Sequence, residues 1–319
     1  MSATKPRILV IRGGAIGDFI LTLPAIAALR KQFPQAHLEV LGYPHIAQLA
    51  VAGGLVDRVQ PIEARGLAGF FARDSVVLEP DLKDYFSEFD LVVSYLYDPD
   101  GIFKTNLRRC LFGQFIAGPH RPNEAEPIHA AQAYLKPLER LAIFDADPVP
   151  RLSLRASTSD MADLVVGLDA RQRVPAVALH PGSGSEEKNW PEGKWAEFMT
   201  RLMDSTKLDL LLVGGEAEGG RLQRLAAAVP SGRCGIAQSL PLPELAWRLQ
   251  TCTAFIGHDS GISHLAAALG LPSLVLWAEA LEEIWRPQGE RVVILRELTG
   301  VGTISVQKVT DELHRLIGG

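Results

Sequence analysis

Short apolar runs alternate with amphipathic segments along most of this 319-residue chain. Runs such as Arg7–Arg12, Leu91–Ser94 and Ser273–Trp277 have the length and composition of buried strands. Segments such as 18–33 and 191–203 carry apolar residues at helical spacing. Strands that alternate with helices form βαβ units, and such units build a parallel sheet covered by helices. The sequence therefore predicts an α/β fold.

A polar segment interrupts this alternation near the middle of the chain. Residues 151–174 are rich in Ser, Asp and Arg, and strands and helices resume after them. We therefore expect two doubly wound domains, residues 1–158 and 172–302, followed by an amphipathic C-terminal helix at 303–319. Ligands of doubly wound domains bind at the carboxyl ends of the strands, and a cleft between two such domains is a natural site.

Further elements follow from the same periodicity. We expect strands at 37–42, 176–180, 208–213 and 254–257, and helices at 44–51, 126–143, 218–229, 241–249 and 260–269. Pro24 lies inside the first helix and is expected to kink it.

Composition and charge exclude several classes of protein. The chain is 47% hydrophobic and 22% charged, which argues against disorder, and its net charge of −5 argues against a nucleic-acid partner. Its cysteines are Cys110, Cys234 and Cys252, an odd number without CxxC spacing, which disfavours a disulfide framework and a cysteine zinc site. No apolar stretch approaches the roughly 18 residues of a membrane span. We expect a reduced, cytoplasmic protein.

A glycine-rich turn follows the first strand. Gly13, Gly14 and Gly17 allow a ligand to approach the backbone, and the helix behind them attracts anions. A dinucleotide fingerprint, GxGxxG, would need a glycine where Arg12 stands. The second strand also ends at Gly42 without an acidic residue for a ribose. Both features disfavour a nicotinamide oxidoreductase.

Two roles are possible for Asp18, at the end of this turn. Aspartate is a favoured helix cap, and the position suits that role. Alternatively, its carboxylate projects into a cleft as a general base.

Two loops of the second half offer groups suited to a nucleotide. Ser183 and Ser185 lie in a Ser/Gly loop after a strand, and Lys188 follows that loop. Backbone N–H groups, hydroxyls and a lysine suit phosphate oxygens, although a solvated surface lysine is the simpler reading. Glu216 follows the next strand and could bind ribose hydroxyls, or simply favour a helix N-terminus.

The stretch 257–264 is the most informative. Asp259 and Ser260 stand at a helix start, and the backbone N–H groups of Gly261 and Ile262 would face an anion. His264 follows one turn after Ser260 and could donate to a phosphate, although a lone histidine is usually structural.

Three motifs resemble glycosyltransferase family 9, the heptosyltransferases: RILVIRGGAIGDFILTLPAIAALR from Arg7, LHPGSGSEEKNWP from Leu179, and GHDSGISHLAAALGLPSLVLW from Gly257. The helix-like segment HAAQAYLKPLERLAI from His129 is also similar to the family. The resemblance implies a GT-B architecture, in which two Rossmann-like domains face a central cleft. It also implies that the C-terminal helix packs back on the first domain.

The resemblance further implies an inverting, metal-independent transferase with no cofactor. The donor, a nucleotide sugar expected to be ADP-heptose, would bind the second domain. The acceptor, a lipopolysaccharide-core glycan or glycolipid, would bind the first, which would bring the protein to the inner face of the plasma membrane. Carried over by motif position, Asp18 would be the base, Lys188 a phosphate ligand and Glu216 a ribose ligand. The phosphate loop would comprise Asp259, Ser260, Gly261, Ile262 and His264, with Ser183 and Ser185 as further phosphate ligands.

Two departures from the family leave the substrates open. Ala278-Glu279-Ala280 stands where the family usually has a glycine-rich, threonine-containing loop, and residues 60–125 do not match clearly. The alternatives are a transferase or epimerase that uses another nucleotide sugar, and an inactive nucleotide-sugar-binding module. Asp98-Pro99-Asp100 resembles the Asp-x-Asp metal motif of other glycosyltransferases, but Pro99 and Gly101 favour a turn.

Overall fold

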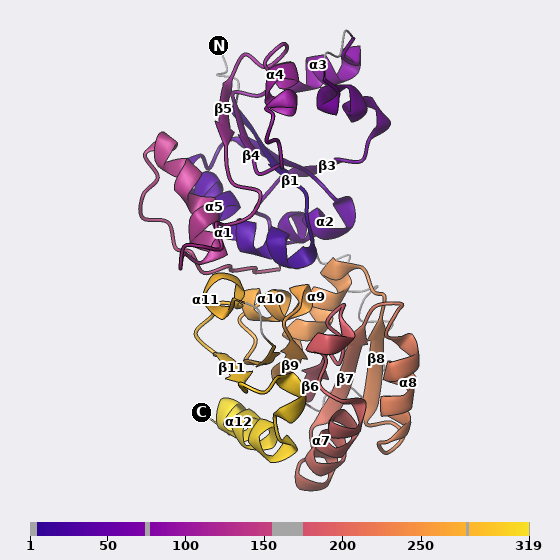
Figure 1. Cartoon of the computed structure of the whole chain (residues 1–319). Helices are drawn as coiled ribbons and strands as arrows, with labels where there is room; N and C mark the ends of the chain where they lie inside the picture. Colours follow the sequence, from indigo (N-terminus) through magenta and orange to yellow (C-terminus); the bar gives the residue numbers. More distant parts are fainter. Residues whose placement is uncertain (1–4, 74–76, 155–174, 279–280, 319) are drawn as a thin grey trace. The chain divides into compact units, whose positions relative to one another are not determined.

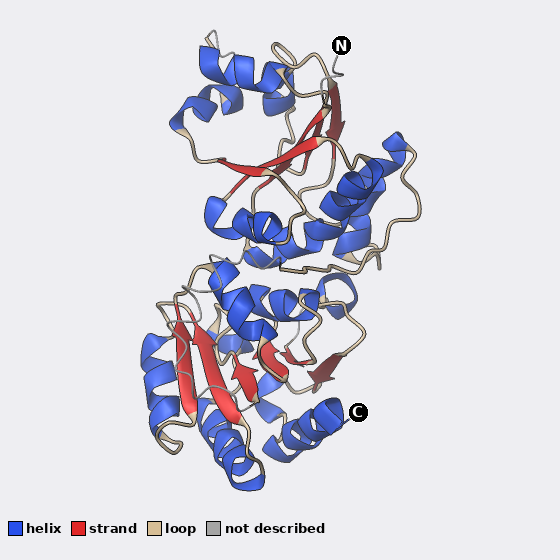
Figure 2. Cartoon of the chain, turned by 180° about the vertical axis from the view of Figure 1, so that it is seen from behind, coloured by secondary structure: helices blue, strands red, loops and turns tan. Residues whose placement is uncertain are grey.

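A computed structural model of the chain describes residues 5–73, 77–154, 175–278 and 281–318 (Figure 1). The chain divides into two compact units, Met1–Val149 and Pro150–Gly319. Each unit holds one parallel sheet flanked by helices (Figure 2). The division precedes residue 158, where the sequence placed it. One reason is that Leu152 N donates to Ala268 O at 2.7 Å and so ties this segment to the second unit.

The sheet of the first unit has the strand order β3-β2-β1-β4-β5. Its strands are β1 (Arg7–Arg12), β2 (His37–Gly42), β3 (Arg58–Pro61), β4 (Leu91–Ser94) and β5 (Gln114–Ala117). The central strand β1 pairs in parallel with β2 and β4, so that Val10 lies beside Val40 and Val93. The winding reverses between β1 and β4, and the carboxyl ends of these two strands form the switch point where ligands of such sheets bind.

The helices of the first unit are α1 (Ile16–Gln32), α2 (Pro44–Ala52), α3 (Pro80–Ser87), α4 (Ile102–Leu107) and α5 (Ala130–Leu135), with 3₁₀ helices η1 (Arg65–Phe71) and η2 (Lys136–Leu141). The single helix expected at 126–143 is wrong. α5 begins only after His129, whose ring accepts from Ala131 N at 3.2 Å. After α5 the chain tightens into η2 around Pro137, which has no N–H to continue an α-helix.

The sheet of the second unit has the order β11-β10-β9-β6-β7-β8, and all of its strands are parallel. They are β6 (Ala176–Leu179), β7 (Asp209–Gly214), β8 (Cys234–Gln238), β9 (Ala254–His258), β10 (Ser273–Trp277) and β11 (Val292–Arg296). Here the winding reverses between β6 and β9. The loops after these two strands therefore meet at the switch point of the second sheet.

Helices α7 (Glu192–Ser205), α8 (Gly219–Ala227), α9 (Leu242–Gln250), α10 (Gly261–Ala268), α11 (Glu282–Trp285) and α12 (Val306–Gly318) belong to the second unit, with η3 (Glu186–Lys188) and η4 (Val301–Thr303). The C-terminal helix α12 packs against α7, β9 and β10 of this same unit. Val309 and Leu313 of α12 are fully buried in the core of the unit. Packing of this helix on the first domain, which the resemblance implies, stays a prediction.

In the part of the chain that the structure describes, no helix is both long and apolar enough to cross a membrane.

Candidate functional site

The turn after β1 places Asp18 at the third position of α1. Ala15, the N-cap residue, has no side-chain acceptor, and Asp18 Oδ2 accepts from the Ala15 backbone N–H at 3.0 Å. The other carboxylate oxygen, Oδ1, lies 3.5 Å from Arg12 Nη2. Gly14 has a φ of +100°, and a Cβ there would stand 2.8 Å from Asp18 Oδ2. Glycine at position 14 therefore makes both the turn and the position of the carboxylate possible.

Arg12 is buried at the end of β1 and joins the loops around the switch point. Its guanidinium donates to His120 O at 2.8 Å, to Asp18 O at 3.2 Å and to Tyr95 O at 3.4 Å. It also lies over the ring of Tyr134, 4.5 Å from the centroid. A guanidinium keeps its charge when buried, so it holds the backbone carbonyls of three segments around one cation. The sequence analysis noted Arg12 only because it stands where a dinucleotide fingerprint needs a glycine, and did not predict these contacts.

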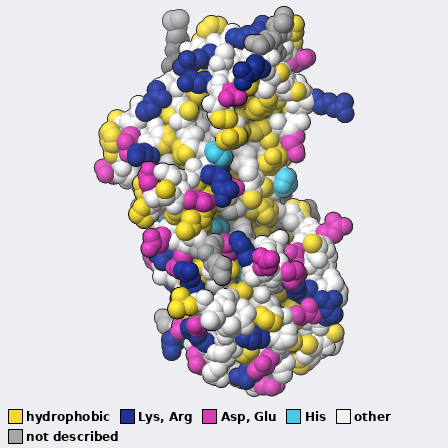
Figure 3. All heavy atoms as spheres, viewed as in Figure 1, with side chains coloured by type: hydrophobic (Ala, Val, Ile, Leu, Met, Phe, Trp, Pro, Cys, Tyr) yellow, Lys and Arg dark blue, Asp and Glu magenta, His cyan; other side chains and the backbone are white. Residues whose placement is uncertain are grey.

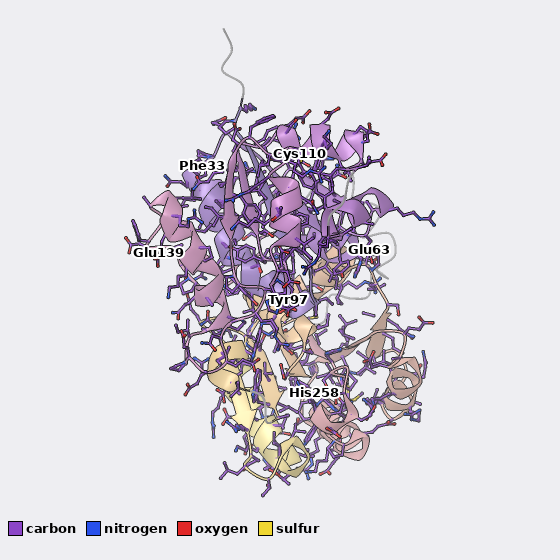
Figure 4. The ribbon with its side chains drawn as sticks, turned by 45° about the horizontal axis from the view of Figure 1, so that its top comes forward. Phe33, Glu63, Tyr97, Cys110, Glu139 and His258 are labelled. Atoms are coloured by element: carbon purple, nitrogen blue, oxygen red, sulfur yellow. The ribbon has the colours of Figure 1, made fainter. Side chains whose placement is uncertain are left out.

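Two aromatic rings are exposed at the same edge of the first sheet. Tyr97 follows β4 and His120 follows β5, and their ring centroids are 4.6 Å apart. The Tyr97 side chain, labelled in Figure 4, is 68% exposed. The backbone of His120 is fixed by two contacts of its carbonyl, which accepts from Arg12 and lies 3.4 Å from the Tyr134 hydroxyl. No pattern in the sequence indicated this pair.

The segment Asp98–Asp100 forms a turn, as Pro99 and Gly101 indicated. Asp98 accepts from the backbone N–H groups of Phe103 and Lys104 at the start of α4. Asp100 pairs with Arg73 at 3.0 Å. Within the described residues no group of three or more His, Cys, Asp or Glu side chains is arranged to hold a metal ion.

In the second unit the loops after β6 and β9 lie together and are joined by side chains. Lys188 Nζ lies 2.8 Å from Asp259 Oδ2, which makes an ion pair between the two loops. His180 Nδ1 lies 3.2 Å from Ser260 Oγ. The structure thus brings together three of the residues that the sequence selected, Lys188, Asp259 and Ser260.

Ser260 is the N-cap of α10, and its side chain accepts from Ser263 N. Gly261 and Ile262 form the first turn of α10, where backbone N–H groups have no acceptor within the helix. His264 is buried on α10. The hydroxyl of Ser183 lies within hydrogen-bond distance of Ser185 O and Asn189 Oδ1, so it takes part in the loop's own contacts.

Two glutamates follow β7, and they differ in position. Glu216 is exposed. Glu218 Oε2 accepts from Gly215 N at 2.8 Å, and a Cβ on Gly182 would stand 2.6 Å from Glu218 Oε1. Glu218 therefore packs against the loop after β6, and the sequence missed it. The signal available was a second acid at the N-terminus of the helix after Gly214 and Gly215.

A buried histidine lies beneath these loops. His258, labelled in Figure 4, accepts from Trp190 N at Nε2, 2.8 Å away, and its Nδ1 is 3.3 Å from Gly182 O. Its ring also makes an edge contact with Trp195. Burial lowers the pKa of His258 to about 3 and that of His180 to about 4. Both rings are therefore neutral near pH 7.

Solved structures share this fold over nearly the whole chain. An Escherichia coli ADP-heptose lipopolysaccharide heptosyltransferase II superposes with a TM-score of 0.78, 19% identity and 98% coverage of both chains. An E. coli heptosyltransferase with ADP gives a TM-score of 0.73 at 17% identity, covering 97% of this chain and 99% of the other. The fold is that of GT-B glycosyltransferases, with two parallel α/β sheets.

The particular family follows from the sequence. The model of glycosyltransferase family 9 (heptosyltransferase) matches residues 128–313, and the chain belongs to this family. Lipopolysaccharide heptosyltransferase 1 of Pseudomonas aeruginosa is 27% identical, covering 85% of this chain and 78% of that protein. Lipopolysaccharide heptosyltransferase 2 of Salmonella typhimurium is 21% identical, with 98% of each chain covered. The protein is thus a glycosyltransferase.

Proposed function

We propose that this enzyme transfers a heptose from ADP-heptose to a lipopolysaccharide-core or related glycan, with inversion at the anomeric carbon and without a metal ion. The observation that carries the donor half is the cluster of Lys188, Asp259 and Ser260 at the switch point of the second sheet. Membership of family 9 and the names of its relatives support the sugar and the acceptor class.

The donor diphosphate would bind at the first turn of α10. Its oxygens would accept from the N–H groups of Gly261 and Ile262, where the helix dipole also favours an anion. Lys188 now pairs with Asp259, and a diphosphate would take over part of that contact. The side chains of Ser183, Ser185 and His264 would complete the phosphate site, and Glu216, exposed after β7, would accept from the ribose hydroxyls.

Asp18 would act as the general base on the acceptor hydroxyl. Its Oδ2 accepts from the Ala15 N–H at 3.0 Å, so the proton would go to Oδ1, which lies 3.5 Å from Arg12 Nη2. As the acceptor oxygen attacks the anomeric carbon, the bond to the diphosphate breaks and negative charge develops on the leaving group. Lys188 and the N-terminus of α10 would stabilise that charge in the role that a metal ion has elsewhere.

The acceptor would bind the first unit beside Tyr97 and His120. Sugar rings present apolar C–H faces, and exposed aromatic rings offer a surface for them. Both loops are held by the buried Arg12, which also contacts Asp18, so a sugar on these rings would lie near the base. Figure 3 shows basic, acidic and histidine side chains among hydrophobic ones on one face of this unit, and its basic side chains would contact the phosphates of a glycolipid acceptor at the inner face of the plasma membrane.

Calorimetric titration with ADP, UDP and GDP, without added metal, tests the donor half. We expect selective binding of ADP that the Glu216→Ala variant weakens. Incubation with ADP-heptose and deacylated core oligosaccharide from heptose-deficient bacteria then tests the reaction, with the product mass measured by mass spectrometry. Preference for UDP or GDP would overturn the donor, and ADP binding without a heptosylated product would overturn the reaction or its acceptor.

A further inference from the structure

His258 makes two directional contacts that cross between loops. The Trp190 backbone N–H can only donate, so Nε2 of His258 must carry a lone pair. The proton of the neutral ring is then on Nδ1, where it can donate to Gly182 O. The two contacts thus require the same tautomer, and each joins the end of β9 to the segment between β6 and α7.

The partners of His258 lie next to the residues of the candidate phosphate site. Asp259 directly follows His258, and Trp190 is two residues after Lys188. Gly182 directly precedes Ser183. Trp190 is itself anchored, because its indole N–H donates to Ile304 O at 2.9 Å. A shift of the His258 ring would therefore move Lys188 relative to Asp259.

We propose that His258, as the neutral Nδ1-protonated tautomer, is the positioning residue that sets the register of the two loops for a nucleoside diphosphate. The inference rests on the proposed function, in which the diphosphate binds at these loops. His258 is fully buried and does not reach the ligand itself, so it acts through Lys188, Asp259 and the first turn of α10. The charged or titratable groups that influence its ring are His180 and Arg221, and Glu218 faces His180.

Two conservative substitutions separate the contacts of the ring. In His258→Gln the side-chain oxygen can reach the position of Nε2 and accept from Trp190, whereas His258→Asn keeps only a donor near the position of Nδ1. A third variant, Leu313→Ala, serves as the control, because Leu313 is fully buried in α12 of the same unit and makes none of the hydrogen bonds of the His258 ring. The control lowers stability through a cavity in the core and leaves those hydrogen bonds in place.

The affinities for ADP and adenosine distinguish positioning from general destabilisation. We expect His258→Asn to weaken ADP binding about tenfold, the scale of one lost hydrogen bond at a charged site, and to change adenosine binding far less. The Gln variant should retain most of the ADP affinity, and Leu313→Ala should leave both affinities unchanged below its melting temperature. Equal losses for ADP and adenosine in His258→Asn, or unchanged ADP binding in both His258 variants, would overturn the positioning role.

Nitrogen NMR of ¹⁵N-histidine-labelled protein gives a readout that does not depend on activity. We expect His258 to remain the Nδ1-protonated neutral form from pH 8 to pH 5, with or without ADP. The Nε2-protonated form would overturn the proposal. Absence of ADP binding by the unmodified chain would instead contradict the proposed function, and with it the role toward a diphosphate, whatever the tautomer.

Discussion

The enzyme twice has an aspartate at the start of a helix that follows a buried strand, Asp18 at α1 and Asp259 at α10, and the two helices are capped differently. At α1 the N-cap is Ala15, and Asp18 accepts from its backbone N–H. At α10 the N-cap is Ser260, which accepts from Ser263 N with its own side chain. Asp259, one residue earlier, is therefore free of capping and pairs with Lys188.

This difference shows how a neighbour decides what an aspartate can do. A serine at the N-cap satisfies part of the helix start, so that the preceding carboxylate can meet a lysine from another loop. Without such a side chain, the aspartate inside the helix supplies the acceptor, and one of its oxygens is committed. Asp18 can therefore act both as a helix cap and as a general base only if Oδ1 is the oxygen that takes the proton.

The two switch points also differ in their buried polar group. Beneath the first lies Arg12, a permanent cation that donates to carbonyls of three segments. Beneath the second lies His258, a neutral ring with one donor and one acceptor. The first arrangement places a positive charge beside the proposed base, whereas the second fixes geometry without adding charge to a phosphate site.

Asp18→Asn has the largest expected effect, because it tests whether Asp18 acts as a base as well as accepting the Ala15 N–H. The amide oxygen of the substituted side chain could still accept from the Ala15 N–H, so α1 should keep its start, whereas an amide cannot take the acceptor proton. We expect turnover of ADP-heptose with acceptor to fall by at least ~100-fold, the usual scale for the loss of a general base. Donor affinity and melting temperature should stay near those of the unmodified enzyme. Near-normal turnover would refute Asp18 as the base.

The neutral histidines beneath the second switch point predict acid sensitivity. The pKa values of His258 and His180 are lowered to about 3 and about 4, whereas an unfolded histidine titrates near ~6.5. Below that pH the unfolded chain takes up protons that the folded chain excludes. The free energy of unfolding should therefore fall from about pH 6.5 toward pH 4, by up to about 1.4 kcal/mol per pH unit for each histidine.

Urea unfolding at pH 7 and pH 5, followed by tryptophan fluorescence, measures this loss, since Trp190 and Trp195 lie in the same core. A double variant, His180→Asn with His258→Gln, should show a smaller difference between the two pH values. An equal difference in the variant and the unmodified chain would assign the acid sensitivity to other groups.

Lys188→Ala tests whether Lys188, which pairs with Asp259, binds the phosphates of the donor. We expect ADP affinity to fall about tenfold, as for one lost hydrogen bond between charged groups, and adenosine affinity to change little. The matched control is Lys207→Ala, because Lys207 is exposed just before β7, at the opposite edge of the sheet from the loops. Equal losses for both ligands, or an equal loss in the control, would argue against phosphate contact.

The strands that the sequence revealed are those that bury both faces. β1, β4, β9 and β10 are continuous apolar runs and were predicted nearly to their ends. The edge strands β3, β5, β8 and β11 were missed. β3 reads Arg-Val-Gln-Pro with both end residues exposed, and most of β8 is only half-buried. β3, β5 and β8 are short or interrupted by polar residues and glycine, and they leave little trace in hydrophobic periodicity. β11 differs, because its run Val-Val-Ile-Leu is apolar and was not interpreted as a strand.

The candidate site also has features that the sequence predicts and features that it does not. That loops after neighbouring parallel strands meet follows from topology, and this brought Lys188 near Asp259 although 71 residues separate them. Their direct pairing, the position of Glu218 against Gly182, and the roles of Arg12 and His258 depend on side-chain packing between loops. No spacing along the chain encodes such contacts.

Exchange of the two N-cap residues has the smallest expected effect and tests the difference between α1 and α10 directly. Ser260→Ala should lower the free energy of unfolding by about 1 kcal/mol, the usual value of an N-cap side chain, and Ala15→Ser should raise it by a few tenths to about 1 kcal/mol. A hydroxyl at position 15 would give α1 its own cap, so the added variant Asp18→Ala should cost less in Ala15→Ser than in the unmodified chain. Thermal unfolding of the four proteins measures that difference. If the cost of Asp18→Ala is the same in both backgrounds, Asp18 does not stabilise the start of α1, and the contrast between the two helices must come from the charge of Arg12 instead.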